Sequence, residues 1–330
     1  MTNVRIAIVG ASGNVGRRLI AQLLTQPWAQ AAQLTLLASP KSAGQSLNID
    51  GKTFTLQALS EQALQNQDIV LFCTETDVSS QWVPVALKAG AYVIDSSSHY
   101  RLDKDVPLII PPVNIHHVTK NQKLYAHANC LASPIATVIA PLHRALGVKY
   151  LNVATYQSTS GAGKAAMDEC FSQTEAAITH KPFQPAVFKR QIAFNVIPQV
   201  GSIAEDGTTS EEYKIIHEVQ KVVEASFPIS AMAVRVPVMI GHSIAMTVSF
   251  DRTPTLNSVR DVLKSAKSIT LSGNDYATPA EVVGQDDVFV GRMRLDPALP
   301  NGLQLWLCSD NLRRGAATDA LEIVGALIHL

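Results

Sequence analysis

The chain has 330 residues, of which 47% are apolar and 16% charged, and Lys+Arg and Asp+Glu are both 27. This balance excludes a disordered chain and a basic surface for nucleic acid or an anionic membrane, and the length favours two domains. The sequence shows no run of about 18 apolar residues, and a strand pattern begins almost at its first residue, so we expect a cytoplasmic protein without a signal peptide.

Strand and helix patterns alternate over the first 110 residues. Short apolar runs predict strands at 5–9, 33–38, 68–73, 91–95 and 107–110, and helical spacing predicts helices over 14–26 and through Trp82 to Gly90. Strands that alternate with helices are typical of a parallel, doubly wound sheet.

After about residue 128 the pattern changes. Helices are predicted over 134–146, 164–179 and 312–329, and strands over 150–157, 231–239, 244–251, 288–295 and 303–308. Several strands without intervening helices indicate a mixed or antiparallel sheet. Residues 180–230 carry no regular pattern, and we assign no element to them.

A glycine-rich turn joins the first strand to the first helix. Gly10, Gly13 and Gly16 are three residues apart, and this spacing lets backbone amides and the helix dipole face a pyrophosphate. The spacing differs from the commoner G-x-G-x-x-G, so the prediction of a dinucleotide site depends on the position of this turn after the first strand. The alternative is a glycine-rich turn with no ligand.

The residues after the second strand predict which dinucleotide would bind. NAD-binding sites usually carry an acidic residue there, to hold the ribose 2′-hydroxyl. This chain has Ser39 and Lys41 and no carboxylate in that stretch, which suits a 2′-phosphate. We therefore expect NADP, with Lys41 as a solvated loop charge being the alternative.

One of the four cysteines is a candidate nucleophile. Cys130 precedes a segment with helical apolar spacing, so it would lie at a helix N-terminus, where the dipole and amides favour a thiolate and can stabilise an oxyanion. Cys73, Cys170 and Cys308 fit the commoner case of an inert apolar thiol. The cysteines form no C-x-x-C pair or metal-ligand spacing, so no metal site is expected.

At Asn129-Cys130 the chain resembles the aspartate-semialdehyde dehydrogenase family, and the resemblance extends over nearly its whole length. The matching blocks occur in the family's order: the glycine turn, Asp95–Arg101, Thr155–Lys164, Gln191–Gln199, Ser210–Lys214, Arg235–His242 and Asp310–Ala317. Each block is weak alone, but their joint order is highly specific.

The resemblance implies an enzyme that reduces β-aspartyl phosphate to aspartate semialdehyde with NADPH, in the biosynthesis of lysine, methionine and threonine. Cys130 would form a thioester, His242 would be the acid/base residue, and Gln157 would help to place the substrate beside the nucleophile. The implied substrate grips are Arg235 for the α-carboxylate and Glu211 for the α-amino group, with a phosphate-binding set of Arg101, Asn129 and Lys214.

The resemblance also implies the fold, the cofactor contacts and the assembly. A Rossmann-like NADP-binding domain would comprise 1–128 and 312–330, and an α+β catalytic and dimerisation domain with a mixed sheet would comprise 129–311. The expected cofactor-binding residues are Gly10, Ser12, Gly13, Asn14, Val15, Gly16, Ser39, Lys41, Ser160, Gly161, Gly163 and Asn311. Relatives pair through the second domain, so a homodimer or homotetramer is expected, to which the irregular 180–230 segment could contribute.

Each of these residues also has a simpler interpretation when considered alone. His242 after Gly241 could be structural, Glu211 and Lys214 could be a surface ion pair on a helix, and Arg101 could be an exposed salt bridge. Only the joint order of the blocks favours the catalytic interpretation.

The chain departs from the family pattern in several loops. The residues after the nucleophile are Leu131-Ala132 in place of small hydroxyls, with Pro134 in the first helical turn. Thr74–Asp77 brings two acids where the family has small residues, and Pro112 and Ile244 replace polar residues. These departures raise one alternative, a cofactor-binding relative with little or no activity. A separate alternative is a reductase of another acyl phosphate such as N-acetylglutamyl phosphate. Glu211 argues against the latter, because an acylated nitrogen carries no charge.

Overall fold

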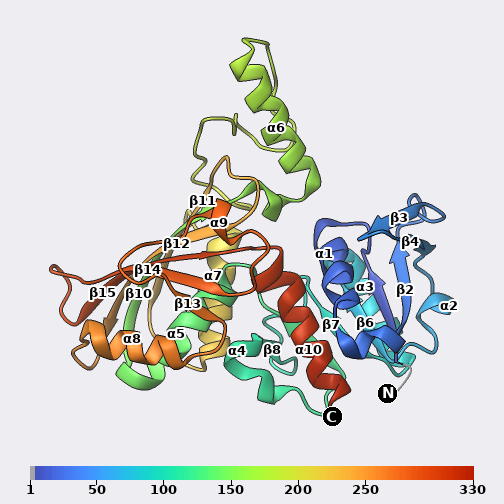
Figure 1. Ribbon diagram of the computed structural model, residues 1–330, viewed down its shortest axis with the longest axis horizontal. Coiled ribbons are helices and arrows are strands. Elements are labelled where there is room, and N and C mark those ends of the chain that lie inside the picture. The colour runs from blue at the N-terminus through green and yellow to red at the C-terminus, as the bar shows by residue number, and fades with distance from the viewer. Residues whose placement is uncertain (1–3) are drawn as a thin grey trace. The chain divides into compact units, whose positions relative to one another are not determined.

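The computed structural model describes residues 4–330, which fall into two compact units. One unit runs through Asn129 and takes back Gly315–Leu330 at the end of the chain, and the other is Cys130–Arg314. The first unit is built on a seven-stranded sheet and the second on a six-stranded sheet (Figure 1).

The seven-stranded sheet of the first unit is parallel throughout, with the strand order β5-β2-β1-β6-β7-β9-β8. Its strands in that order are Gln57–Ala58, Gln33–Ala38, Arg5–Val9, Ile69–Phe72, Tyr92–Asp95, Leu124–His127 and Leu108–Ile109. The helices of this unit are α1 (Asn14–Leu24), α2 (Glu61–Leu64), α3 (Thr76–Lys88), α4 (Pro111–Asn114) and α10 (Thr318–Ile328), with 3-10 turns at Pro27–Ala31 and Ile115–His117. A small antiparallel hairpin, β3 (Ser46–Ile49) and β4 (Lys52–Thr55), completes it.

Both faces of this parallel sheet are buried. Alternate residues of β1 and β6, such as Ile8 and Leu71, lie in one core with side chains from α1 and α10. The intervening residues, such as Val9 and Phe72, are buried as well. Because successive side chains point to opposite faces, the second face must also be covered, and α3 supplies buried residues there. The sheet is therefore doubly wound.

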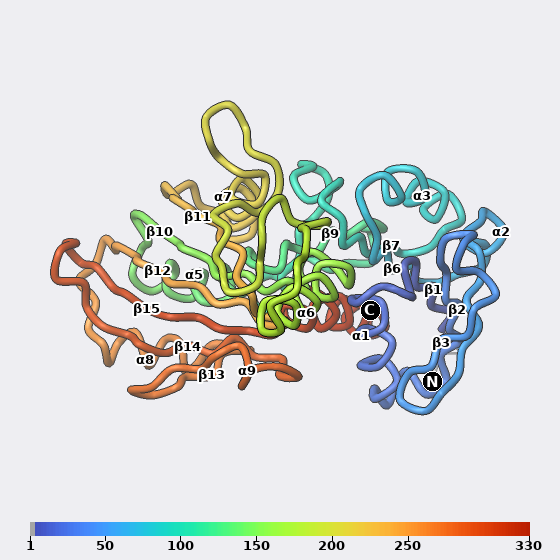
Figure 2. The backbone as a smooth tube through the Cα atoms, turned by 90° about the horizontal axis from the view of Figure 1, so that it is seen from above, coloured from blue at the N-terminus to red at the C-terminus, as the bar shows by residue number. Residues whose placement is uncertain are grey.

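The six-stranded sheet of the second unit is mixed, with the order β11-β10-β12-β15-β14-β13. Its strands in that order are Ile229–Arg235, Val148–Gln157, His242–Phe250, Gly302–Ser309, Val288–Leu295 and Ile269–Leu271. The helices are α5 (Ala132–Leu146), α6 (Lys164–Ile178), α7 (Ser210–Val223), α8 (Leu256–Ser265) and α9 (Pro279–Val282), with a 3-10 turn at Thr159–Ala162 and a π-helical turn at Arg313–Ala317. Figure 2 shows β10, β12 and β15 side by side along the length of this unit.

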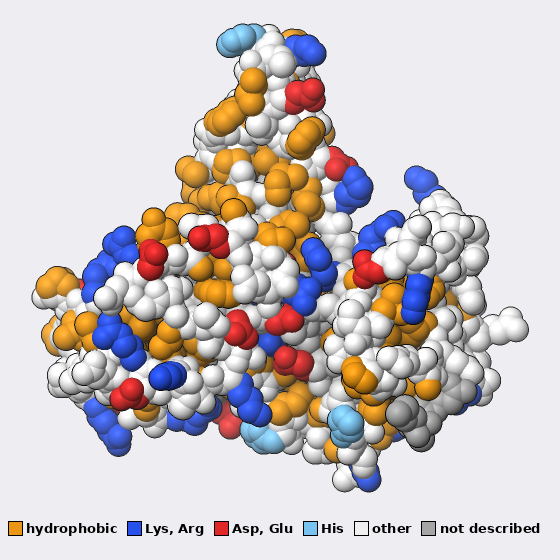
Figure 3. Space-filling model, in the orientation of Figure 1, with side chains coloured by type: hydrophobic (Ala, Val, Ile, Leu, Met, Phe, Trp, Pro, Cys, Tyr) orange, Lys and Arg blue, Asp and Glu red, His pale blue; other side chains and the backbone are white. Residues whose placement is uncertain are grey.

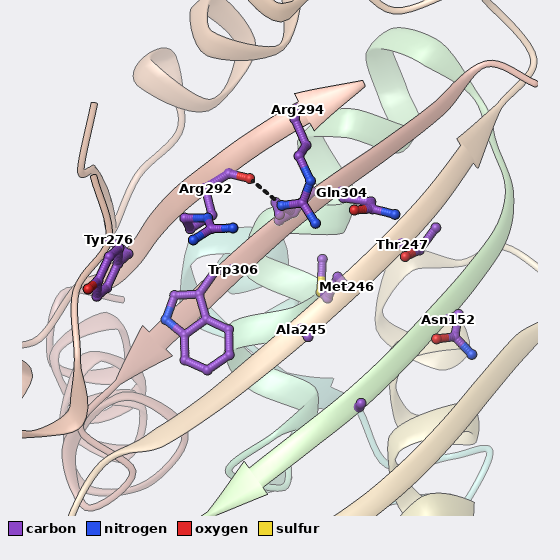
Figure 4. A pocket seen from close by; sticks show the side chains of 11 residues that line it. Asn152, Ala245, Met246, Thr247, Tyr276, Arg292, Arg294, Gln304 and Trp306 are labelled. Carbon is purple, nitrogen blue, oxygen red and sulfur yellow. Dashed lines mark hydrogen bonds between the residues drawn. The ribbon is translucent and has the colours of Figure 1, made fainter. Parts of the chain in front are cut away.

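The two faces of the mixed sheet differ in cover. The first carries α5, α7 and α8, which pack against one another and against the strands. The second is open and holds a hollow of about 430 Å³, around which Trp306, Tyr276 and Arg292 lie (Figure 4). None of the residues predicted for catalysis or binding lines this hollow.

Helix α6 and the chain that follows it form an arm that extends away from the mixed sheet (Figure 1). Glu169 accepts hydrogen bonds from the backbone amides of Ala186 and Val187, and Gln173 accepts one from Ile192. These two α6 side chains therefore hold a loop that has no helix or strand of its own. Figure 3 shows hydrophobic side chains on this arm, where Phe171 and Phe194 are 66% and 70% exposed.

The predicted strands and helices are largely confirmed. The main differences are that α10 begins at Thr318 after a π-helical turn rather than at 312, and that β11 ends at Arg235 rather than at 239. Helix α7, helix α8 and strand β9 were not predicted. Within residues 4–330, no helix combines the length and the apolar character required to cross a bilayer.

Candidate active site

Three neighbouring strands of the mixed sheet bring predicted site residues to one edge. Gln157 and Arg235 are the last residues of β10 and β11 and are register partners in this parallel pair. His242 is the first residue of β12, which runs antiparallel to β10. The alternation of the strands turns the buried Gln157 and Arg235 toward the face that α7 covers, while Tyr156 points to the open face.

Gln157 and Glu211 are joined by a buried hydrogen bond. The Nε2 of Gln157 donates to Oε1 of Glu211 over 3.1 Å, and Lys214 Nζ lies 3.0 Å from Oε2 of the same carboxylate. Thr155 Oγ1 donates to the carbonyl oxygen of the Gln157 side chain. The Glu211 side chain is only 8% exposed and that of Lys214 is 31% exposed, so this pair is no ordinary surface ion pair.

Arg235 is a buried cation at the same edge. Its Nη1 donates a 2.6 Å hydrogen bond to the carbonyl oxygen of Ser158, and the residue is 6% exposed. Burial lowers the pKa of Arg235, while the charges of Glu211 and Cys130 act in the opposite direction. Arg235 is also one of the residues that line a cavity of about 230 Å³. A cation in this setting can hold a carboxylate that enters the cavity.

His242 is fully buried and neutral. Burial and, next, the charge of Arg235 lower the pKa of its imidazole to about 3, with Glu211 acting in the opposite direction. Its Nδ1 accepts a hydrogen bond of 3.0 Å from the backbone amide of Ser158, and its Nε2 has no hydrogen-bond partner among the residues that the structure describes. The near-neutral titration expected of an ordinary histidine therefore does not apply here.

Asn311 connects the residues around this imidazole. Its Oδ1 accepts from Gly241 N over 2.9 Å and from the hydroxyls of Ser158 and Ser160 over 3.1 Å each, and its Nδ2 donates to Ser160 Oγ. Asn311, Ser158 and Ser160 are almost completely buried. The polar atoms of Ser160 and Asn311, which the sequence predicted to contact a cofactor, are thus engaged with one another and with the His242 segment.

Gly161 leaves the space between two of these groups open. A Cβ at this position would lie 3.2 Å from Arg235 Nη1 and 3.2 Å from Nε2 of His242. The bare backbone therefore lets the guanidinium and the imidazole approach the same point. Gly163, also predicted as a cofactor contact, has φ +90 and open space around it, and it directly precedes α6.

Cys130 lies two residues before α5 and is partly exposed. No side chain caps this helix by a hydrogen bond, and Pro134 occupies its third position, where a proline is tolerated. The other three thiols differ from Cys130 in their surroundings. Burial raises the pKa of Cys73 to about 12 and that of Cys308 to about 11, and it raises that of Cys170. A raised pKa disfavours the reactive thiolate, which supports the interpretation of these three cysteines as unreactive thiols.

In the first unit, the glycine turn has a backbone geometry that a side chain at Gly10 or Gly16 would not allow. Gly10 has φ +82, and a Cβ there would lie 2.3 Å from the carbonyl oxygen of Cys73, whereas a Cβ on Gly16 would lie 2.4 Å from Gly10 O. Gly13 directly precedes α1, and no side chain caps this helix. Ser12, whose carbonyl accepts from Arg17 Nε, completes the turn, and Asn14 and Val15 begin the helix. The turn thus forms a bare backbone cradle at a helix N-terminus, which fits a pyrophosphate.

The loop after β2 adjoins this turn. Gly10 N donates to Leu37 O over 2.9 Å, so the end of β2 lies beside the glycines. Ser39 and Lys41 follow and are exposed. Glu75 and Asp77, the two acids after β6, are exposed at the N-terminal end of α3, where negative charge is favourable to the helix.

The remaining predicted residues also belong to the first unit. Arg101 is 7% exposed and its Nη2 donates to Ser96 O over 2.6 Å, so it is not an exposed salt bridge. Asn129, the last residue of this unit before the chain enters the second, is 7% exposed. His127 ends β9 and is buried, and burial, with the charge of Arg101, lowers its pKa.

Two residues that the sequence analysis did not single out help to build the site. The carbonyl oxygen of Ser158 accepts a hydrogen bond from Arg235, and its backbone amide donates one to His242. Glu212 accepts from the amides of Thr209 and Ala233, so it both caps α7 and ties that helix to β11. The T-x-x-E spacing of a capping box was the signal that could have revealed Glu212, whereas no side-chain pattern marks a backbone amide such as that of Ser158.

Two family models match the chain. Residues 5–121 match the model described as semialdehyde dehydrogenase, NAD binding domain, and residues 139–314 match semialdehyde dehydrogenase, dimerisation domain. Among known relatives, the aspartate-semialdehyde dehydrogenase of Rickettsia conorii is 39% identical over 98% of this chain and 97% of its own length. That of Bacillus subtilis is 35% identical over 99% and 98% of the two chains.

Solved structures agree with these matches. The crystal structure of aspartate semialdehyde dehydrogenase II from Vibrio cholerae superposes with a TM-score of 0.94 at 37% identity and covers 99% of both chains. The same enzyme complexed with ASA has a TM-score of 0.95 at 36% identity, covering 100% of this chain and 99% of that one. With both family models matched and relatives above 30% identity over nearly its full length, the chain belongs to the aspartate-semialdehyde dehydrogenase family.

Proposed function

We propose that the protein reduces β-aspartyl phosphate to aspartate semialdehyde and phosphate, reversibly, with NADPH and through a thioester on Cys130. The observation that carries this proposal is the convergence of Gln157, Arg235 and His242 at one edge of the mixed sheet, with Glu211 hydrogen-bonded to Gln157. This arrangement fits a small zwitterionic substrate, and the negative charge of a Cys130 thiolate acts to raise the pKa of Arg235.

In the proposed reaction the Cys130 thiolate attacks the acyl carbon, the carbon–oxygen bond to phosphate breaks, and a thioester forms. The nicotinamide, when bound, supplies the hydride that reduces the thioester carbon. The carbon–sulfur bond then breaks, which releases the aldehyde and regenerates the thiolate. The position of Cys130 just before α5, where the helix dipole favours negative charge, supports its role as the nucleophile.

The substrate grips follow from charge. Arg235 would hold the α-carboxylate and Glu211 the α-ammonium group, and both side chains are buried enough for these pairs to be strong. Arg101, Asn129 and Lys214 would contact the phosphate. A reductase of N-acetylglutamyl phosphate is disfavoured, because its substrate brings no ammonium group to meet Glu211.

We propose NADP as the dinucleotide. The bare Gly10–Gly16 turn would hold the pyrophosphate, and Ser39 and Lys41 would hold the 2′-phosphate. Ser12, Asn14 and Val15 would line the same turn. The absence of a carboxylate in the exposed loop after β2 supports the choice of NADP over NAD. The first unit would accordingly be the NADP-binding domain and the second the catalytic domain.

A homodimer or homotetramer that pairs through the second unit is part of this proposal. The matched dimerisation model and the open face of the mixed sheet, where Tyr156 and Met232 are 39% and 53% exposed, support it. Sedimentation of the full chain would give the oligomeric state, and replacing Trp306 on this face by Glu should shift it toward the monomer.

The central experiment is phosphate-dependent formation of NADPH from aspartate semialdehyde and NADP, with NAD run in parallel. Cys130→Ser should abolish turnover, because a hydroxyl at this site is a far weaker nucleophile than a thiolate. The matched control is Cys170→Ser, a buried thiol in the same unit, which should retain turnover. A wild-type rate in Cys130→Ser would exclude the thioester route, and equal rates with NAD would exclude the preference for NADP.

A further inference from the structure

The loop between β6 and α3 lies directly against the glycine turn of the first unit. A Cβ on Gly10 would lie 2.3 Å from the carbonyl oxygen of Cys73 and 3.0 Å from Cγ2 of Thr74. Cys73 N donates to Val9 O over 2.9 Å, so the loop begins beside the last residue of β1. Side chains on this loop are therefore neighbours of any molecule that the glycine turn holds.

The order of the strands indicates which half of a dinucleotide would meet this loop. Strand β1 lies between β2 and β6, and the turn after β1 would hold the pyrophosphate. In sheets of this kind the residues after the second strand contact the ribose next to the adenine, and here Ser39 and Lys41 follow β2. The nicotinamide half would then extend to the other side of β1, over the carboxyl end of β6 and the loop that follows it.

Glu75, the last residue of this loop, has an exposed side chain that contributes little to the fold. It occupies the N-cap position of α3 but makes no side-chain cap hydrogen bond, and within residues 4–330 no ion pair includes it. Its charge can favour α3 through the helix dipole, but Asp77 in the first turn of α3 does the same. The carboxylate of Glu75 is therefore available to a ligand.

The backbone on both sides of Glu75 is held in place by hydroxyl groups. Thr74 Oγ1 lies 3.2 Å from Ser79 Oγ, and Thr76 Oγ1 lies 3.1 Å from Ser98 Oγ. These two contacts tie the loop to α3 and to the segment after β7. The charge of Glu75 is thus carried by a loop with a defined position beside the glycine turn.

The two redox forms of a nicotinamide dinucleotide differ by one charge. The ring is a cation in the oxidised form and neutral in the reduced form, whereas the phosphates are the same in both. A nearby carboxylate attracts the cationic ring alone, and its repulsion of the phosphates acts on both forms equally. The ratio of the two dissociation constants therefore isolates the effect of a carboxylate on the ring.

We propose that Glu75 is a specificity-determining residue that shifts binding in the first unit toward the oxidised dinucleotide. This inference rests on the proposed function, in which a nicotinamide dinucleotide binds at the Gly10–Gly16 turn. In that function NADP is the product of acyl phosphate reduction and a substrate of the reverse reaction, so Glu75 would favour its retention. The same preference is expected for NAD over NADH, because the 2′-phosphate belongs to the other half of the molecule.

Calorimetric titration of the full-length protein with NADP and with NADPH measures the two dissociation constants without turnover. The ratio of the Kd for NADPH to the Kd for NADP should fall about three- to fivefold in Glu75→Gln, which is the effect of one exposed charge pair. Glu75→Asp, which keeps the charge, should retain most of the wild-type ratio. The matched control is Asp105→Asn, which should leave the ratio unchanged, because Asp105 is exposed and precedes β8 at the amino ends of the parallel strands.

Salt distinguishes an effect of charge from a change in the shape of the loop. The difference in ratio between the wild type and Glu75→Gln should narrow between about 0.05 and 0.5 M NaCl, because ions screen exposed charges. An unchanged ratio in Glu75→Gln, or a shift of the ratio that salt does not alter, would overturn the inference.

These outcomes separate the inference from the function on which it rests. A shifted ratio without turnover of aspartate semialdehyde would refute the proposed reaction and leave the role of Glu75 standing. Turnover combined with an unchanged ratio in Glu75→Gln would refute the role of Glu75 alone. Failure of the wild-type protein to bind either redox form would refute both.

Discussion

Replacing Gly161 by Ala adds a single methyl group where two proposed catalytic side chains approach the backbone. The new carbon would lie 3.2 Å from Arg235 Nη1 and 3.2 Å from both Cε1 and Nε2 of His242. Gly161 does not need a left-handed backbone, since its φ lies outside the positive range, so the substitution tests space rather than strain.

The side chains of Arg235 and His242 can move only slightly to make room for the added methyl group. Arg235 is tied to Ser158 O by a 2.6 Å hydrogen bond, and His242 is tied to Ser158 N by one of 3.0 Å. A shift of a few tenths of an ångström is needed, which we expect to lower kcat by about 3- to 10-fold. Gly161 itself is exposed, but Arg235 and His242 beside it are buried, so crowding them also costs about 1 kcal/mol, the low end for overpacking. Initial rates and urea unfolding of the same preparation measure both effects.

Gly325→Ala is the matched control. Gly325 lies within α10, where an added Cβ meets no atom within 4 Å, so alanine should stabilise the helix by about 0.4–1 kcal/mol and leave kcat unchanged. If Gly161→Ala matched the wild type in both rate and unfolding, the two side chains would not converge over this glycine, and the site geometry described above would be wrong.

Three further predictions follow from single contacts. Glu212→Gln should lower the free energy of unfolding by about 1–3 kcal/mol in urea, because its carboxylate accepts from two backbone amides and the new NH₂ group would face one of them; an unchanged midpoint would contradict this. Lys41→Ala should raise KM for NADP by about two- to fivefold and leave KM for NAD unchanged, as an exposed ion pair implies; equal changes would refute its contact with the 2′-phosphate. Burial and the charge of Arg235, opposed by Glu211, lower the pKa of His242 to about 3, so the ring loses its proton well below neutrality. The kcat of the wild type between pH 5 and 9 should therefore show no inflection near 6.5 that is due to His242. An inflection near 6.5 that is present in the wild type and absent in His242→Gln would contradict this.

The sequence predicted the parallel sheet well because both faces of it are buried. Continuous apolar runs such as Ile69–Phe72, each followed by helical spacing, leave little choice of element. Strand β9 was missed because four residues between two loops carry no period of their own. Helix α7 was missed although the T-x-x-E spacing from Thr209 marks its start. The residues before Thr209 show no regular hydrophobic pattern, so the whole stretch was left without an assigned element.

For the candidate site, the sequence predicted which residues take part but not the protonation state of His242. Glu211 and Arg235 could be named from the resemblance to the family, and the charges that a zwitterionic substrate requires agree with that assignment. The neutral state of His242 could not, because it depends on burial and on a backbone amide that every sequence possesses. The hydrogen bonds of Asn311 to Gly241 and Ser158 were likewise not predicted, because no sequence pattern marks them, and its predicted contact with the cofactor stays a prediction.

The return of α10 to the first unit has a consequence for how the chain folds during synthesis. Ile323 and Val324 of this helix belong to the same core as Leu19 and Leu23 of α1, so that core stays incomplete until α10 has left the ribosome. The second unit lies within one continuous stretch and can fold as soon as Arg314 has emerged. A chain cut short before Thr318 would therefore keep an intact mixed sheet while exposing apolar side chains of the parallel one.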